Sequence, residues 1–368
     1  MALILNSTPK KDGFYFPAEF AHHKACWLMY PERTDIYPFE AKHVQEKYIE
    51  LTTKISLYEQ VCLCVSEKEY SNVKRIFPSN IKIIEIPSDG NWLRDTGPTF
   101  LLNNNGDIRG IDWEFNAWGG FNGGCYSPWN KDNEVARKIL DLEGIDFYKC
   151  NLFLEGGAIL SDGEGTLLTT EETLLNPNRN PKYNKSEIEA ILKEYLNVEK
   201  VIWIKRGIYR DEAGGHIDGI CCFMKPAVVA LTWTDDKDDP QYEISLEAFE
   251  TLNSEVDAKG RKFEIHKIHQ PSPQYITKAE SDSIKKVKGT ISRATGERLP
   301  ASYINFYFAN NAIILPIFDD SEFDTLAIQQ FKQISPDKKI IPIQSRSILL
   351  GGGNIHCMTQ QQPAINII

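Results

Sequence analysis

Short apolar runs alternate with amphipathic stretches along the whole chain, and this alternation predicts strands separated by helices. We predict strands over residues 61–65, 81–86, 200–204, 220–223, 228–232, 262–268, 303–308, 312–317 and 339–343. Helices are predicted over residues 67–77, 186–196 and 243–256 and after residue 321. The helix at 186–196 opens with Ser186 followed by Glu189, the spacing of a capping box. Repeated strand–helix–strand units are typical of an α/β fold.

Glycine-rich polar turns recur between these units. They fall at Gly97, Gly119–Gly120, Gly156–Gly157, Gly214–Gly215 and Gly351–Gly353. Five such turns suggest five pseudo-repeats around an axis, although their uneven spacing does not by itself establish a repeat. Glycine lets the backbone approach its neighbours closely, so the five segments can converge on one central site.

The last of these turns presents a candidate nucleophile. Gly351–Gly353 is followed by Asn354, Ile355, His356 and Cys357. Free cysteine is often a buried structural residue, but the polar neighbours here make a poor apolar environment, which favours a reactive thiol. Because the thiolate is the reactive form, a nearby cation would activate it.

A histidine and two carboxylates provide what such a nucleophile needs. His216 and Asp218 are two residues apart, and on a strand they would project from the same face. Asp95 follows Trp92 in a second turn. His216 could instead be a core histidine, and either aspartate could make only local turn bonds. One thiol, one imidazole and two carboxylates suit a cationic, planar carbon such as that of a guanidinium.

His356 is the rival base, because it adjoins Cys357. Adjacent residues on a strand point to opposite faces, so we expect His356 to face away from the target of the thiol. Trp92 and Trp118 could be core aromatics or the walls of a slot for a cation. Glu155 and Glu212 adjoin two glycine turns and could be surface charges.

These residues lie in motifs that resemble agmatine deiminases. The matching segments are residues 92–98, 116–120, 154–157, 215–218, 257–261, 301–306 and 351–363, and the likeness runs from Ser7 almost to the end. The resemblance implies a five-bladed α/β-propeller of the pentein-like, guanidine-modifying superfamily. It also implies hydrolysis of agmatine to N-carbamoylputrescine and ammonia, a step of polyamine metabolism, without a cofactor, in a homo-oligomer (dimer or tetramer).

Roles follow from the resemblance residue by residue. Cys357 matches the nucleophile and His216 the general acid/base. Asp95 and Asp218 match the guanidinium-binding carboxylates. Trp92 and, with less support, Trp118 match the pocket wall. Glu155 and Glu212 match acidic pocket residues, one of which would meet the distal ammonium.

Composition narrows the function further. With 51 acidic and 41 basic residues the net charge is −10, which disfavours nucleic-acid binding and would help attract a polycationic small molecule, although many soluble proteins are acidic. No linker divides the chain, so we predict one domain over residues 1–368. No apolar run reaches the ~18 residues of a membrane span, and the first twenty residues lack a signal sequence.

Cysteine usage points to the cytoplasm. The eight cysteines form no disulfide framework. Cys62–Cys64 and Cys221–Cys222 lack the spacing of zinc pairs, so we assign them to the core and predict no metal.

The main alternative function is that of an arginine or peptidylarginine deiminase of the same superfamily, which would differ in the pocket for the tail of the substrate. The motif segments supply four carboxylates against one basic residue, Arg94, which on a strand would face away from Asp95. An arginine carboxylate would then lack a partner, so we expect agmatine to be preferred. Arg179 or Arg346 could overturn this expectation by reaching the pocket. An inactive propeller that only binds cations is the rival from another class.

Overall fold

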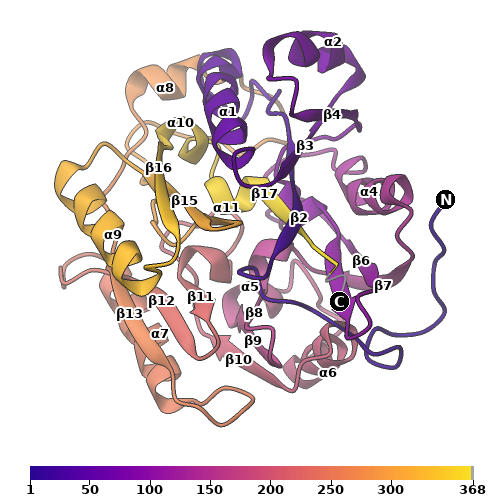
Figure 1. Cartoon of the computed structure of the whole chain (residues 1–368). Coiled ribbons are helices and arrows are strands. Elements are labelled where there is room, and N and C mark those ends of the chain that lie inside the picture. Colours follow the sequence, from indigo (N-terminus) through magenta and orange to yellow (C-terminus); the bar gives the residue numbers. More distant parts are fainter. Residues whose placement is uncertain (366–368) are drawn as a thin grey trace.

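Five small sheets surround one axis in the computed structural model, which describes residues 1–365, and the long helices lie on the outside (Figure 1). Three strands repeat in every sheet. The first two are antiparallel, and the third joins the second in parallel after a helical crossover. The predicted five-bladed α/β-propeller is therefore confirmed.

The first blade joins both ends of the chain. It is formed by β17 (Thr359–Pro363), β2 (His23–Met29), β3 (Gln60–Val65) and β4 (Lys82–Glu85), with helices α1 (Lys42–Ile55) and α2 (Glu67–Ile76). The second contains β1 (Phe14–Tyr15), β5 (Thr99–Asn103), β6 (Ile108–Glu114), β7 (Phe147–Phe153) and α4 (Val135–Glu143). The third contains β8 (Leu160–Ser161), β9 (Thr166–Thr170), β10 (Lys200–Ile204), α5 (Glu171–Leu174) and α6 (Lys185–Leu196).

The last two blades follow the same plan. The fourth contains β11 (Cys221–Lys225), β12 (Val228–Trp233), β13 (Glu264–His269) and α7 (Gln241–Ser254). The fifth contains β14 (Tyr307–Ala309), β15 (Ala312–Ile317), β16 (Lys339–Gln344) and α9 (Ser321–Ile334). Two shorter helices, α8 (Lys278–Ser283) and α10 (Arg346–Leu349), lie in the connections.

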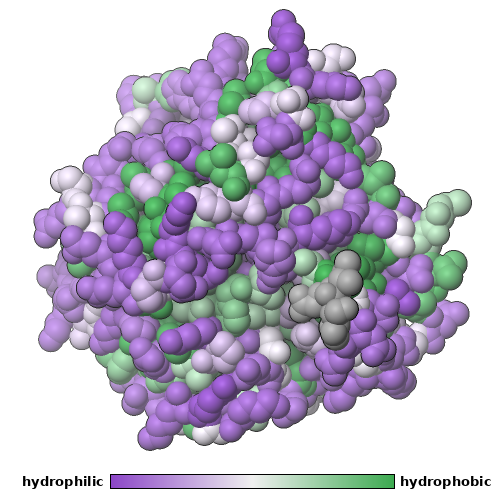
Figure 2. Space-filling model, in the orientation of Figure 1, coloured by the Kyte–Doolittle hydropathy of each residue, from purple (hydrophilic) through white to green (hydrophobic). Residues whose placement is uncertain are grey.

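Apolar strands form the core of each blade. Every residue of β12 is buried, as expected for the central strand of a sheet that is covered on both faces. Helix α7 packs onto this sheet through a stripe of Ile244, Ala248 and Leu252. The face of the molecule seen in Figure 2 is mostly hydrophilic, with small apolar patches between polar side chains. Within residues 1–365, no helix is both long and apolar enough to cross a membrane.

A short turn precedes the first strand of each blade. These turns are α3 (Leu93–Thr96) before β5, η3 (Gly156–Ala158) before β8, η4 (Ile217–Gly219) before β11, residues 302–306 before β14 and α11 (Ile355–Met358) before β17. Contacts link α11 to α3, α3 to η3 and η3 to η4, and Asn305 of the remaining turn donates to the Asp218 carbonyl and accepts from the His356 amide. The five turns therefore meet, and they bring together the segments in which the candidate chemistry lies.

Several local predictions were wrong. Arg94, Asp218 and His356 lie in helical turns rather than strands, because the chain bends sharply where it enters each blade. His216 is the residue just before η4. The predicted strand 303–308 is a strand only from Tyr307. The capping box of α6 is made by Asn184 and Glu187, since the Asn184 side chain accepts from the Glu187 amide at 3.1 Å.

Candidate active site

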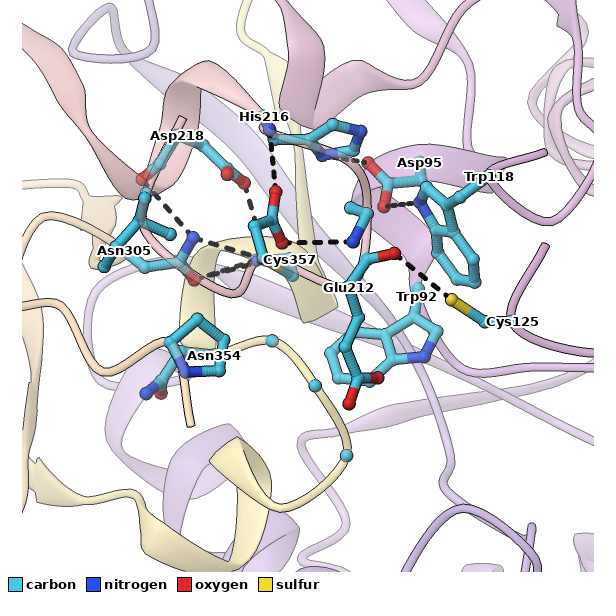
Figure 3. A pocket seen from close by; sticks show the side chains of 18 of the residues that line it. Trp92, Asp95, Trp118, Cys125, Glu212, His216, Asp218, Asn305, Asn354 and Cys357 are labelled. Atoms are coloured by element: carbon cyan, nitrogen blue, oxygen red, sulfur yellow. Dashed lines mark hydrogen bonds and ion pairs between the residues drawn. The ribbon is translucent and has the colours of Figure 1, made fainter. Parts of the chain in front are cut away.

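One pocket opens where the five turns meet (Figure 3). Seven of the eight predicted site residues line it: Trp92, Asp95, Trp118, Glu212, His216, Asp218 and Cys357. The eighth, Glu155, lies behind His216. Because they come from separate turns of the ring, their meeting is a property of the fold rather than of any one motif.

Cys357 is carried by α11, whose N-cap Asn354 accepts the Ile355 amide at 2.9 Å. Gly353 is required beside it, because an added Cβ would lie 2.8 Å from the Trp92 ring and 3.0 Å from the Cys357 sulfur. The thiol is 3.4 Å from Asp218 Oδ2, and the Asn305 amide donates to its sulfur at 3.3 Å. Burial, together with Asp218 and Asp95, raises the pKa of this thiol well above its ordinary value, so it is protonated at neutral pH.

Asp95 is a carboxylate held by two neutral donors. Trp118 Nε1 donates to its Oδ2 at 3.0 Å, and the Gly157 amide donates to its Oδ1 at 2.9 Å. Burial raises the pKa of Asp95 to about 6, because the attraction of His216 does not fully offset it.

Asp218 is held instead by a histidine. His356 Nδ1 lies 2.8 Å from Asp218 Oδ2. Burial alone would raise the pKa of Asp218, but the hydrogen bond and charge of His356 outweigh it and keep the pKa below its ordinary value. The two carboxylates of the pocket therefore differ in acidity.

His216 is buried at 1% exposure between two carboxylates. Its Nδ1 is 3.9 Å from Asp95 Oδ1, and its Nε2 is 3.8 Å from Glu155 Oε2. Within the described chain, neither ring nitrogen has a hydrogen-bond partner. Burial would lower the pKa of His216, but Asp95 and Glu155 raise it to about 10. The ring is therefore an imidazolium at neutral pH, with protons free to be donated.

Glu155 and Glu212 have different surroundings. Glu155 accepts from Arg179 Nε at 2.6 Å, and both side chains are buried. Glu212 lines the pocket and binds the guanidinium of Arg293, which also donates to the Gly351 carbonyl at 2.8 Å. Glu155 is thus placed to orient His216, and Glu212 is placed at the wall.

Sequence reasoning missed three further pocket residues. Asn305 contacts the thiol, and it lies in the motif 301–306 without having been singled out. Asp211 accepts from the amides of Gly215 and His216 at 2.9 and 2.7 Å, which shapes the turn before η4. Arg293 lies in a loop with no recognisable pattern, and nothing in the sequence would have found it.

The basic residues that the sequence raised do not line the pocket. Arg94 is turned away as expected, although from a helix, and pairs with Glu19 at 2.8 Å. Arg179 is engaged by Glu155, and Arg346 pairs with Glu280 at 2.9 Å on α8. The pocket arginine is Arg293.

Among residues 1–365, no three or more His, Cys, Asp or Glu side chains are grouped to hold a metal ion. The eight cysteines carry no disulfide there, and all except Cys357 are buried.

Comparison with known proteins places these features in context. Residues 15–363 match the family described as Porphyromonas-type peptidyl-arginine deiminase. The agmatine deiminases of Ectopseudomonas mendocina and Pseudomonas fluorescens are each 47% identical over 362 residues, which is 98% of this chain and of each relative. A solved agmatine deiminase from Enterococcus faecalis superposes with a TM-score of 0.96 at 42% identity, covering 99% of this chain and all of that one.

Proposed function

The chain belongs to the Porphyromonas-type peptidyl-arginine deiminase family and is a hydrolase acting on C–N bonds of amidines, and from this premise we propose that its substrate is agmatine. Agmatine would be converted to N-carbamoylputrescine and ammonia in the cytoplasm, on a route to putrescine. The observation that carries the proposal is the convergence of one thiol, one imidazolium and two carboxylates on a single pocket. Binding alone would need only the carboxylates.

Substrate recognition uses the two carboxylates. The guanidinium would donate to Asp95 and Asp218, and each charge-assisted bond contributes about 1.5–3 kcal/mol. This grip places the central carbon against Cys357 and restrains its rotation. The cation also offsets the two negative charges that keep the thiol protonated, so substrate binding favours release of the thiol proton.

The first half-reaction forms a covalent intermediate. Cys357 gives up its thiol proton to solvent and its sulfur bonds to the guanidinium carbon. His216 gives its proton to one terminal nitrogen, whose bond to that carbon breaks, and the ammonia released takes up a proton from solvent as ammonium. The product of this step is an amidino-thioether on Cys357. Glu155 holds His216 in place from behind, through its buried pair with Arg179.

The second half-reaction hydrolyses that intermediate. His216, now neutral, takes a proton from water, and the oxygen bonds to the amidino carbon. The C–S bond then breaks as the hydroxyl proton of this adduct passes to the sulfur, which releases the neutral ureido product and restores the Cys357 thiol. No step requires a cofactor.

The tail of the substrate would lie beside Trp92, Trp118 and Glu212. Glu212 keeps one oxygen for a distal ammonium, since its contact with Arg293 is made by its other oxygen, Oε2. A second candidate function, deimination of free arginine, is favoured by one observation: Nε and Nη1 of Arg293 have no hydrogen-bond partner within residues 1–365. Arg293 could therefore receive an α-carboxylate.

One experiment tests the covalent reaction. Wild-type protein turning over agmatine is quenched in acid and examined by mass spectrometry, and an amidino adduct is expected on Cys357. Cys357→Ala should form no ureido product in a colorimetric assay while its melting temperature stays close to wild type. Substantial turnover by the alanine variant would exclude this mechanism.

A further inference from the structure

A buried chain of alternating charges runs behind the pocket and ends at the nucleophile. Arg94 Nη1 lies 2.8 Å from Glu19 Oε1, and His356 Nε2 lies 2.9 Å from both oxygens of Glu19. His356 Nδ1 lies 2.8 Å from Asp218 Oδ2, which in turn is 3.4 Å from Cys357 sulfur. The mechanism above uses only the last two of these residues.

The partners of His356 decide its charge. Both ring nitrogens face carboxylates, and an ionised carboxylate can only accept hydrogen bonds. Burial would raise the pKa of Glu19, but Arg94 and His356 bring it to about 2. Both flanking carboxylates are therefore ionised, so both ring nitrogens must donate, and His356 is an imidazolium. The charges of Arg94, Glu19, His356 and Asp218 alternate and cancel.

We propose that His356 is a positioning residue, whose imidazolium, clamped between Glu19 and Asp218, holds Asp218 ionised and in the orientation that grips the guanidinium. The inference rests on the proposed function for its substrate. His356 contributes this charge from behind the pocket wall, since it does not line the pocket itself. Its backbone amide, which donates to the Asn305 carbonyl at 3.1 Å, fixes it from the other side.

Other charges also act on this pair. The titratable and charged groups that face Asp218 or His356 are Asp95 and Arg94 on α3, Asp211 and His216 before η4, Cys222 on β11, Cys357 on α11, and Glu19 with His23 beyond it. Of the cations among them, only His356 is hydrogen-bonded to the Asp218 carboxylate within the described residues. Its removal should therefore have the largest effect on that carboxylate.

The test is the pH profile of kcat/KM for agmatine in His356→Asn. Asparagine can still donate to Asp218 but carries no charge. The acid limb of the wild type is set by Asp95, whose pKa is about 6, and Asp218 stays ionised across it. Without the charge of His356, burial should raise the pKa of Asp218 past that of Asp95, so the acid limb should move up by at least about one pH unit and become steeper. Activity should return to within about tenfold of wild type near pH 9, where Asp218 is again ionised.

Glu19→Gln removes the carboxylate that favours a proton on the outer nitrogen of His356, so His356 loses part of its charge and the acid limb should shift in the same direction by a smaller amount. If His356→Asn does not fold, the shift of the acid limb in Glu19→Gln tests the proposal instead. His23→Asn is the matched control, because His23 is equally buried but bonds the Glu19 carbonyl and Glu59 instead. It should lower the melting temperature and leave the acid limb in place.

An unshifted acid limb with an equal loss of activity at every pH would reduce His356 to a structural residue and overturn the proposal. Histidine ¹⁵N NMR checks the charge without turnover: the signal lost in His356→Asn should report two protonated nitrogens at pH 8 in wild type. A neutral ring would also overturn it. Wild-type protein that does not convert agmatine would refute the proposed function and leave the NMR result to judge this inference.

Discussion

Gly157→Ala should inactivate the enzyme while leaving it folded. Gly157 lies in η3, and its amide donates to Asp95. A Cβ added there would lie 2.7 Å from His216 Nδ1, 2.8 Å from Asp218 Oδ2 and 3.0 Å from Asp95 Oδ1. One methyl group would thus press on three of the four proposed catalytic side chains at once.

The size of the effect follows from these distances. Ordinary contact begins at 3.4 Å, so the three atoms must move by 3.4 − 2.7 = 0.7 Å, 3.4 − 2.8 = 0.6 Å and 3.4 − 3.0 = 0.4 Å. Misplacement of about 1 Å can cost ~10²-fold in rate, and three groups move here, so we expect kcat/KM to fall at least ~10²-fold. The backbone at Gly157 does not have a positive φ, so the loss of stability should be that of overpacking alone, about 1–3 kcal/mol.

Gly144→Ala provides the opposite control. Gly144 has a φ of +65°, and an added Cβ would meet nothing within 4 Å. Alanine there should lower the melting temperature and leave kcat/KM unchanged. The reasoning would be refuted if Gly157→Ala, assayed for ureido product beside this control, kept activity within about threefold of wild type.

The remaining predictions concern charge. The pKa of Asp95 is raised to about 6, so kcat/KM should fall below pH 6 as this carboxyl becomes neutral. The pKa of His216 is raised to about 10, so kcat/KM should also fall above pH 10 as this ring loses its proton. Since the folded pKa of Asp95 is raised, its contribution to the free energy of unfolding is greatest below pH ~4 and is lost as pH rises through about 6, which urea titrations would detect. Asp95→Asn and Asp218→Asn should each lower kcat/KM by about 10–10²-fold or more, the loss of one charge-assisted bond, with melting temperatures within a few degrees of wild type. Agmatine should exceed free arginine in kcat/KM by at least about a hundredfold, or ~2.7 kcal/mol, because Glu212 already balances Arg293; comparable values would show that Arg293 binds the carboxylate.

The sequence allowed the blades to be predicted because their strands and helices are defined by local patterns. Strands such as β10 and β15 are apolar runs of the expected length, and the observed bounds agree with the prediction within a residue. The glycine turns were also informative, since a glycine beside a polar residue marks a place where chains approach closely. Cys357 and His216 both lie beside such turns.

The short turns could not be predicted in the same way, because contacts between distant segments shape them. The turn before His216 bends around Asp211, whose carboxylate accepts three backbone amides. Arg293 reaches the pocket from a loop, and its ion pair with Glu212 holds it there. The roles of such residues depend on contacts between distant segments of the folded ring, so local sequence patterns do not predict them.

Closure of the ring also positions the nucleophile. β17 begins two residues after Cys357 and pairs with β2 near the opposite end of the chain, and Trp27 Nε1 donates to Gln362 Oε1 at 2.9 Å. The same closure brings His356 against Glu19, which lies four residues before β2. The thiol, its neighbouring carboxylate and the charges behind that carboxylate therefore meet only when the first and last strands pair. Closure of the ring therefore completes the site.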